Sequence, residues 1–185
     1  MLKKFDVIII GAGAAGMMSA IEAAKRDRKV LLVDHYKKIG EKIRISGGGR
    51  CNFTNIHTNP NKFLSQNPKF VKSALSQYTQ NDFINLINKY EIKFHEKKLG
   101  QLFCDHSAQQ IVEMLLKECE LANITIYKEF IVKDIIKEND QYFVSTETDK
   151  YSSKSLVIAT GGLSVPKIGA TSFGYEIAKK FDHNI

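Results

Sequence analysis

The feature that most constrains the fold of this chain is a glycine motif near its start, set between two apolar runs. The first run covers residues 5–10, FDVIII. Three glycines then follow in the spacing G-x-G-x-x-G: Gly11, Gly13 and Gly16. An alanine-rich stretch predicts a helix over 14–26, and a second apolar run over 29–33 ends at Asp34. Strand, glycine turn, helix, strand and terminal acid together predict a dinucleotide-binding βαβ unit.

Each position of this motif has a physical role around a pyrophosphate. Gly11 allows the tight turn out of the strand, Gly13 lets the backbone approach the phosphates, and Gly16 lets the helix pack closely on the strand. The N–H groups and the positive dipole end of the helix favour the phosphate charge. Asp34 is placed to accept hydrogen bonds from a ribose hydroxyl and disfavours a 2′-phosphate, so we expect NADP to be excluded here.

The composition is that of an ordinary globular protein. The chain has 185 residues, 43% of them hydrophobic and 25% charged, which is enough for one domain. Its net charge of +7 comes from scattered lysines without a basic helix or an aromatic stripe, so no nucleic-acid partner is expected. The apolar runs are too short for a membrane span, and the first one leads into the glycine turn rather than a signal-peptide cleavage site.

The cysteines and histidines of the chain predict neither disulfides nor a metal site. The three cysteines, an odd number without a C-x-x-C pair, are Cys51, Cys104 and Cys119. They support neither a disulfide framework nor a zinc site, and a cytoplasmic location is expected. The five histidines show no ligand spacing, so no metal site is predicted.

The middle of the chain predicts a loop followed by helices. Residues 36–62 lack periodicity and are expected to form one long functional loop. Residues 68–91 predict helical structure, in one or two helices, and 92–106 predict a small hairpin. Ser107 is expected to cap a helix that runs to about Ala122.

The last third predicts β-structure and a final helix. Residues 124–160 are expected to form strands separated by turns at Glu138–Asp140 and Asp149–Ser153. Residues 172–181 then predict a helix.

Two further glycine-rich segments could bind an anionic ligand through backbone N–H groups. In the first, ATGG at 159–162 follows an apolar run and would deliver N–H groups at the carboxyl end of a sheet. In isolation an ordinary strand-to-loop turn is the favoured interpretation, and the N-terminal glycine motif reverses that preference. In the second, ISGGGRCNFTN at 45–55, three glycines can form an anion-binding nest, and Arg50 can contact a phosphate. A flexible surface loop is the alternative. Cys51 in this segment is expected to be a packing residue rather than a catalytic thiol.

Taken together, these segments resemble the bacterial BaiN-type, aminoacetone-oxidase-like FAD-dependent oxidoreductases. The matching stretches are IIGAGAAGMMSAIEAAK, GEKIRISGGGRCNFTN, HEKKLGQLFCD and VIATGGLSVPKIGATSFGYEIAKKF. The resemblance implies an α/β, Rossmann-like FAD-binding domain with a βαβ start, a helical insertion, a β-meander and a return strand. It implies a flavoprotein with FAD as cofactor and NAD(P)H as a candidate reductant.

The resemblance also assigns cofactor-binding positions. The FAD pyrophosphate would be held by Gly11, Gly13, Ala14, Ala15 and Gly16, and the adenosine ribose by Asp34. Residues along the cofactor toward the flavin would be Lys42, Ser46, Gly47, Gly48, Gly49, Arg50, Cys51 and Asn52. Backbone groups of Val132 would face adenine, and the residues closing over the cofactor would be Thr160, Gly161 and Gly162. No side chain stands out as a general acid or base, so the catalytic residues stay unassigned.

Members of the resembled family are longer than this chain. Residues 1–185 are therefore expected to form one FAD-binding domain, without the substrate domain and the C-terminal return to the FAD domain that the family has. The leading hypothesis is an FAD-dependent oxidoreductase of unknown substrate. Two alternatives stay open: an NAD-dependent dehydrogenase module, or an inactive truncated remnant that needs a partner chain.

Overall fold

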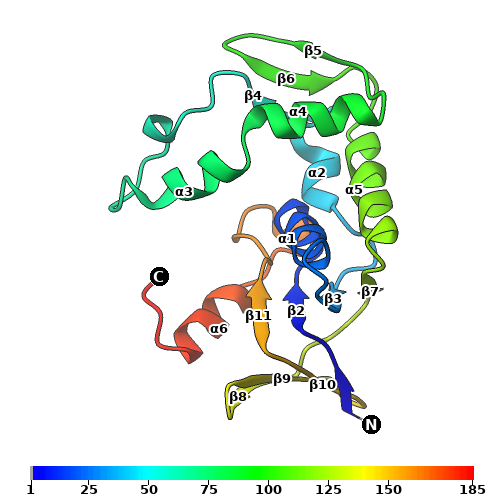
Figure 1. The fold of residues 1–185 in the computed structure, drawn as a ribbon, viewed down its shortest axis with the longest axis vertical. Coiled ribbons are helices and arrows are strands. Elements are labelled where there is room, and N and C mark those ends of the chain that lie inside the picture. Colours follow the sequence, from blue (N-terminus) through cyan, green and yellow to red (C-terminus); the bar gives the residue numbers. More distant parts are fainter. Residues whose placement is uncertain (1) are drawn as a thin grey trace. The chain divides into compact units, whose positions relative to one another are not determined.

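The computed structural model describes residues 2–185, which divide into two compact units. One unit, here called the sheet unit, contains the chain up to Lys42 and again from Leu115 to Ile185. The other, here called the insertion unit, is Ile43–Met114. Figure 1 gives the order of the elements in each. No helix within residues 2–185 combines the length and the apolar character needed to cross a bilayer.

The sheet unit is built on a parallel sheet whose strands lie in the order β11-β2-β3-β7. Their bounds are β2 Val7–Ile10, β3 Val30–Val33, β7 Thr125–Tyr127 and β11 Ser155–Ile158. All three pairings are parallel, with Ile9 opposite both Leu32 and Val157. Ile8, Ile9, Leu31 and Leu32 have no exposed surface, which is why these strands are apolar runs without alternation.

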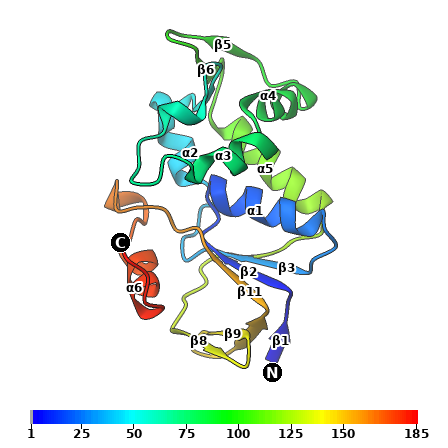
Figure 2. The ribbon, with the colours of Figure 1, turned by 60° about the vertical axis from the view of Figure 1, so that its left-hand side comes forward.

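Helix α1 (Ala14–Ala24) covers one face of this sheet, and an antiparallel meander lies on the other face (Figure 2). The helix buries Gly16, Met17, Ala20 and Ile21. The predicted βαβ start is confirmed, because β2, α1 and β3 lie within the expected ranges.

The meander consists of β8 (Asp134–Glu138), β9 (Gln141–Ser145) and β10 (Lys150–Ser153). Strand β1 (Leu2–Lys4), which the sequence did not predict, pairs in parallel with β10. Apolar side chains of both sheets, with one from the segment between β7 (Thr125–Tyr127) and β8, form one core: Ile8, Ile10, Leu31, Val33, Phe130, Ile135, Val144 and Tyr151. Helix α6 (Phe173–Lys180) lies close to the predicted helical range and packs Phe173 and Ile177 against that core.

One predicted turn of the meander is confirmed and the other is wrong. Asn139 and Asp140 both have positive φ between β8 and β9, as a tight hairpin turn requires. The turn expected at 149–153 is instead strand β10, and the chain reverses at 146–149, where the Asp149 N–H donates to the Thr146 hydroxyl at 3.0 Å. The serines that suggested a turn, Ser152 and Ser153, are buried in the sheet.

The insertion unit has its own sheet, ordered β4-β6-β5. The strands are β4 (Asn52–Asn55), β5 (Phe94–Glu96) and β6 (Gln101–Cys104), and two helices follow β4, α3 (Phe70–Gln77) and α4 (Gln80–Lys89). The predicted helices over 68–91 and the hairpin over 92–106 are confirmed.

Helices α2 (Glu41–Ile45) and α5 (Gln109–Leu121) carry the chain between the units. The predicted cap of α5 is confirmed, because the Ser107 hydroxyl accepts the Gln109 N–H at 3.1 Å. The single long loop expected over 36–62 is wrong: it contains α2, a 3₁₀ turn at Ser46–Gly49, strand β4 and a 3₁₀ turn at Pro60–Lys62. Strand β4 escapes local pattern reasoning because its partner β6 lies far along the chain.

Candidate cofactor site

The turn between β2 and α1 requires glycine at two positions for reasons of packing. Gly11 has φ +105°, and a Cβ there would lie 2.5 Å from the carbonyl oxygen of Ala159. A Cβ on Gly16 would lie 1.8 Å from the carbonyl oxygen of Gly11. Neither distance is sterically possible, so β2, α1 and the segment after β11 are held in close backbone contact here.

Gly13 differs, because a Cβ at this position would meet nothing within 4 Å. Its backbone is extended, with φ −81°, which any residue can adopt. The next two residues, Ala14 and Ala15, are exposed on the first turn of α1. The fold itself does not need glycine at position 13, and the space in front of this helix N-terminus is open to a ligand.

Asp34 joins the end of β3 to the glycine turn. Its Oδ2 accepts the N–H of Ala12 at 2.7 Å, and its Oδ1 accepts the N–H of Tyr36 at 2.8 Å. The side chain is 14% exposed, so both bonds are shielded from water. The sequence predicted a contact of Asp34 with a ribose, and this role as a backbone acceptor was missed. Carboxylate oxygens have further lone pairs, so the two roles are compatible.

The second glycine segment is tied to Lys42 within the sheet unit. The Lys42 ammonium group donates to the carbonyl oxygen of Gly162 at 2.8 Å and lies 3.3 Å from where a Cβ on Gly161 would be. The Thr160 hydroxyl lies 2.6 Å from where a Cβ on Gly174 would be, so this segment also packs closely on α6. Val132 is half-buried against the core between the sheet and the meander.

In the insertion unit, the predicted residues 46–52 form a tight left-handed turn leading into β4. Gly47, Gly48 and Gly49 have φ of +57°, +68° and +85°. The turn is fixed by backbone bonds: the N–H of Cys51 to the oxygen of Ser46 at 3.0 Å, of Cys104 to Arg50 at 2.9 Å, and of Ala108 to Gly49 at 2.7 Å. A Cβ on Gly48 would meet nothing within 4 Å, and the Arg50 side chain is exposed, so this turn presents an open face. Asn52 is exposed at the start of β4.

The three cysteine thiols are buried and free. Burial raises the pKa of Cys51, although a hydrogen bond with Ser46 acts in the opposite direction. Burial raises the pKa of Cys104 to about 11, with smaller contributions from Cys51 and Asp105, and burial raises that of Cys119 to about 12. These thiols are protonated near neutral pH, which accords with packing residues rather than nucleophiles.

The raised thiol pKa values predict a loss of stability in alkali. A thiol with a higher pKa in the folded chain holds its proton more tightly there, so its contribution is intact below the unfolded pKa of 9.0 and is lost as pH rises toward 11. We expect the free energy of unfolding, measured by urea titration, to fall between pH 9 and 11. The fall should be shallower in Cys104→Ala, and an equal slope in both proteins would contradict the assignment.

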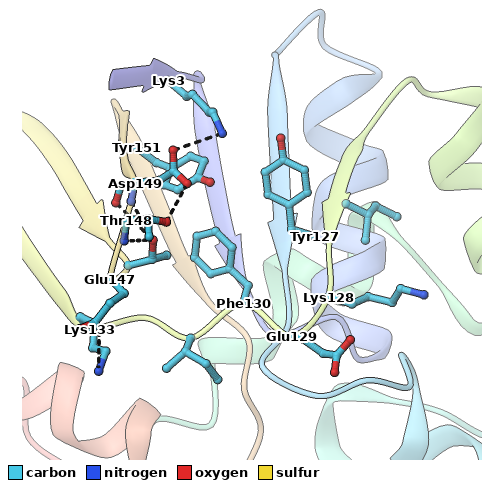
Figure 3. A pocket seen from close by; sticks show the side chains of 13 residues that line it. Lys3, Tyr127, Lys128, Glu129, Phe130, Lys133, Glu147, Thr148, Asp149 and Tyr151 are labelled. Carbon is cyan, nitrogen blue, oxygen red and sulfur yellow. Dashed lines mark hydrogen bonds and ion pairs between the residues drawn. The ribbon is translucent and has the colours of Figure 1, made fainter. Parts of the chain in front are cut away.

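A separate hollow of about 900 Å³ opens beside β7 and the meander (Figure 3). Its wall includes the aromatic rings of Tyr127, Phe130 and Tyr151. Two of its cations are paired with acids that also line it, Lys3 with Asp149 at 3.4 Å and Lys133 with Glu147 at 2.8 Å. The predicted cofactor residues lie outside its lining. Across residues 2–185, no group of three or more His, Cys, Asp or Glu side chains is placed to hold a metal ion.

Two curated proteins are similar to this chain over most or all of its length. The chain is 53% identical over 184 residues to the ribosomal RNA dihydrouridine synthase of Escherichia coli K12, covering 100% of this chain and 46% of that protein. It is 24% identical over 180 residues to the 3-dehydro-bile acid delta(4,6)-reductase of Clostridium scindens, covering 96% and 44%. The chain therefore spans about half the length of these curated relatives.

Two solved structures share the fold. A flavocytochrome c3 fumarate reductase in its open conformation aligns with a TM-score of 0.66 at 19% identity, over 96% of this chain and 40% of that chain. Sdh1 of Mycobacterium smegmatis aligns with a TM-score of 0.62 at 20% identity, over 88% and 34%. The predicted α/β, Rossmann-like fold of FAD-binding proteins is confirmed. The family model for the HI0933-like protein Rossmann domain matches residues 5–185, and the chain belongs to that family.

Proposed function

We propose that this chain is the FAD-binding part of an oxidoreductase that reduces uridine in ribosomal RNA. The cofactor assignment rests on the open space in front of Gly13, at the exposed N-terminus of α1. The other two glycines of the motif, Gly11 and Gly16, are required by packing. The substrate assignment rests on the 53% identity to a ribosomal RNA dihydrouridine synthase. The scattered lysines had argued against a nucleic-acid partner, and the name of this relative favours one.

The residues around the glycine turn fit FAD. The exposed N–H groups of Ala14 and Ala15 would hold the pyrophosphate at the positive end of α1. Asp34 holds the turn in shape through the Ala12 N–H and would accept a bond from the ribose. Lys42 adds a positive charge beside the 160–162 segment and would attract the phosphates. When bound and reduced, FAD supplies a hydride.

The reaction class is the reduction of a carbon–carbon double bond conjugated to a carbonyl. The name of the Escherichia coli relative describes formation of dihydrouridine, and the name of the Clostridium scindens relative describes reduction at positions 4 and 6 of a bile-acid skeleton. The BaiN-type assignment, a single FAD-binding domain over 1–185, a reduced nicotinamide as electron donor and a cytoplasmic location belong to this proposal. Substrate contacts would come from a further segment like the one these relatives have, or from a partner chain.

The test of the cofactor is an absorption spectrum of the purified chain, before and after incubation with FAD and gel filtration. Retained flavin bands are expected, and a colourless protein would overturn the assignment for this chain. A parallel titration with NADH distinguishes this assignment from the alternative, a nicotinamide-binding dehydrogenase module. Such a module would bind NADH and would not bind FAD.

The test of the substrate is anaerobic incubation of the FAD-loaded chain, joined to the segment of the Escherichia coli relative that lies beyond the matched region, with NADPH and ribosomal RNA transcribed without modifications. Mass spectrometry of the digested RNA should show a uridine that has gained two hydrogens. Flavin that is reduced by NADPH without any modified uridine would overturn the RNA substrate and leave the cofactor assignment intact.

A further inference from the structure

One face of the hairpin formed by β5 and β6 carries a row of basic side chains (Figure 1). The sequence across β5 is Lys-Phe-His-Glu-Lys, and successive side chains of a strand point to opposite faces. One face is covered, because Phe94 packs on Phe53 of β4 with ring centroids 5.4 Å apart, and Phe53 packs on Phe83 of α4 at 6.1 Å. The opposite face carries three exposed side chains: Lys93, His95 and Lys97.

The backbone pairing of the hairpin extends one residue past each end of β5. The N–H of Asp105 donates to the carbonyl oxygen of Lys93 at 2.9 Å, and the N–H of Lys97 donates to the carbonyl oxygen of Gln101 at 2.9 Å. The alternation of faces therefore holds for both lysines as well as for the strand between them. Strand register thus gathers basic side chains that look scattered in the sequence.

The positive charge of this face is not neutralised by neighbouring acids. Lys98 follows the row at the hairpin turn, and within residues 2–185 no acid forms an ion pair with Lys93, Lys97 or Lys98. Glu96 alternates to the opposite face of the strand. Asp105 lies on the same face, and its carboxylate is bound to the imidazole of the row. An exposed surface with unpaired lysines attracts a polyanion.

His95 adds an oriented aromatic ring to the middle of the row. The ring stacks on Phe103, its partner in the register of β5 and β6, with centroids 6.4 Å apart and planes 20° from parallel. Nδ1 of His95 lies 2.7 Å from Oδ1 of Asp105, which fixes the rotation of the ring. The His95 side chain is 44% exposed whereas Phe103 is buried, so the accessible ring of this stack is the imidazole. A histidine ring held in this way offers a surface on which an unpaired nucleobase can stack.

We infer that this face of the hairpin binds single-stranded RNA. The face, here called the hairpin face, consists of Lys93, His95, Lys97 and Lys98. The inference rests on the proposed function for the identity of the polyanion. The lysines contact phosphates, and an unpaired base stacks on the imidazole. Surfaces that bind single strands combine positive charge along the backbone with aromatic rings for the bases. All four residues lie in the insertion unit, so the surface is complete within that unit.

The lysines are tested by fluorescence anisotropy with the whole chain and a fluorescein-labelled single-stranded RNA of about 12 nucleotides. The triple variant Lys93→Gln, Lys97→Gln and Lys98→Gln should bind at least about 10-fold more weakly at about 50 mM salt. The slope of log K against log salt should become shallower by about 2, because each lost phosphate contact on a single strand removes about 0.7.

The matched control removes the same charge from the sheet unit. It replaces three exposed lysines that lie in β10, directly after β10 and in α6, by Lys150→Gln, Lys154→Gln and Lys179→Gln. Its affinity for the RNA and its salt slope should equal those of the wild-type chain. Circular dichroism of all variants checks that they are folded.

The imidazole is tested by His95→Ala and His95→Tyr. Loss of the stacked ring in His95→Ala should weaken binding of the single strand by about 5-fold or more. His95→Tyr should restore binding, because a phenol ring also stacks on a base, and a role limited to charge would not be rescued. Double-stranded RNA of the same length should bind more weakly and should not respond to His95→Ala, because its bases are stacked within the duplex.

Several outcomes would overturn the inference. They are absence of RNA binding by the wild-type chain, wild-type binding by the triple variant or by His95→Ala, and equal losses in the triple variant and its control. Binding of phosphatidylserine vesicles in place of RNA would also overturn it. RNA binding that depends on the hairpin face, together with no dihydrouridine from the joined protein described above, would instead overturn the proposed function. The two failures are therefore distinguishable.

Discussion

Replacing Gly16 by alanine should lower the free energy of unfolding by about 3 kcal/mol or more, the upper end of what overpacking costs. The new Cβ would lie 1.8 Å from the carbonyl oxygen of Gly11, and backbone cannot move aside as a flexible side chain can. Helix α1 would have to move off the sheet that it covers. Urea denaturation followed by circular dichroism measures the effect, and wild-type stability of Gly16→Ala would contradict the packing described for this turn.

The matched control is Gly13→Ala, three residues earlier in the same motif. Its Cβ would meet nothing within 4 Å and its φ suits alanine, so the free energy of unfolding should stay within about 0.5 kcal/mol of wild type. FAD retention should nevertheless fall, because the methyl group would occupy the space proposed for the pyrophosphate. A Gly13→Ala protein that retains FAD as wild type does would show that the phosphates lie elsewhere.

Replacing Asp34 by alanine should destabilise the chain by about 2–4 kcal/mol in the absence of FAD. The backbone N–H groups of Ala12 and Tyr36 would each lose an acceptor, at about 1–3 kcal/mol for a buried donor left unpaired. Asp34→Asn keeps one carbonyl acceptor and should lose roughly half as much. The readout is the urea midpoint of the cofactor-free protein, which a role limited to ribose binding would leave unchanged.

The control for this prediction is Glu22→Ala. Glu22 pairs with Lys25 and Arg26 on the exposed side of α1, where such ion pairs contribute little. Its removal should change the midpoint only slightly. A loss as large as that of Asp34→Ala would mean that general charge effects, rather than the two backbone bonds, explain the result.

The sequence predicted well those elements that are defined by nearby residues. The βαβ start, the capped helix after Ser107 and the hairpin of β5 and β6 follow from apolar periodicity and turn residues within short windows. It failed where the partner of a segment is distant. Strand β10 contains Ser152 and Ser153, which resemble a turn, and becomes a strand because it lies between β1 and β9.

The candidate site divides in the same way. Glycine spacing predicted the turn at 11–16, but only the structure separates the glycines required by packing from Gly13, which is not. The backbone role of Asp34 depends on a contact with Ala12, which lies 22 positions earlier in the chain.

The parallel sheet also sets an order for folding. Strand β2 has β3 and β11 as its neighbours, and β3 is close in sequence whereas β11 starts only at Ser155. During synthesis, one edge of β2 therefore stays without its hydrogen-bonding partner until most of the chain has left the ribosome. Pairing of such distant strands makes folding slow, and the apolar edge is exposed to aggregation in the meantime. The glycine motif at 11–16 is thus synthesised well before β11, the strand that completes the sheet around it and that begins only at Ser155.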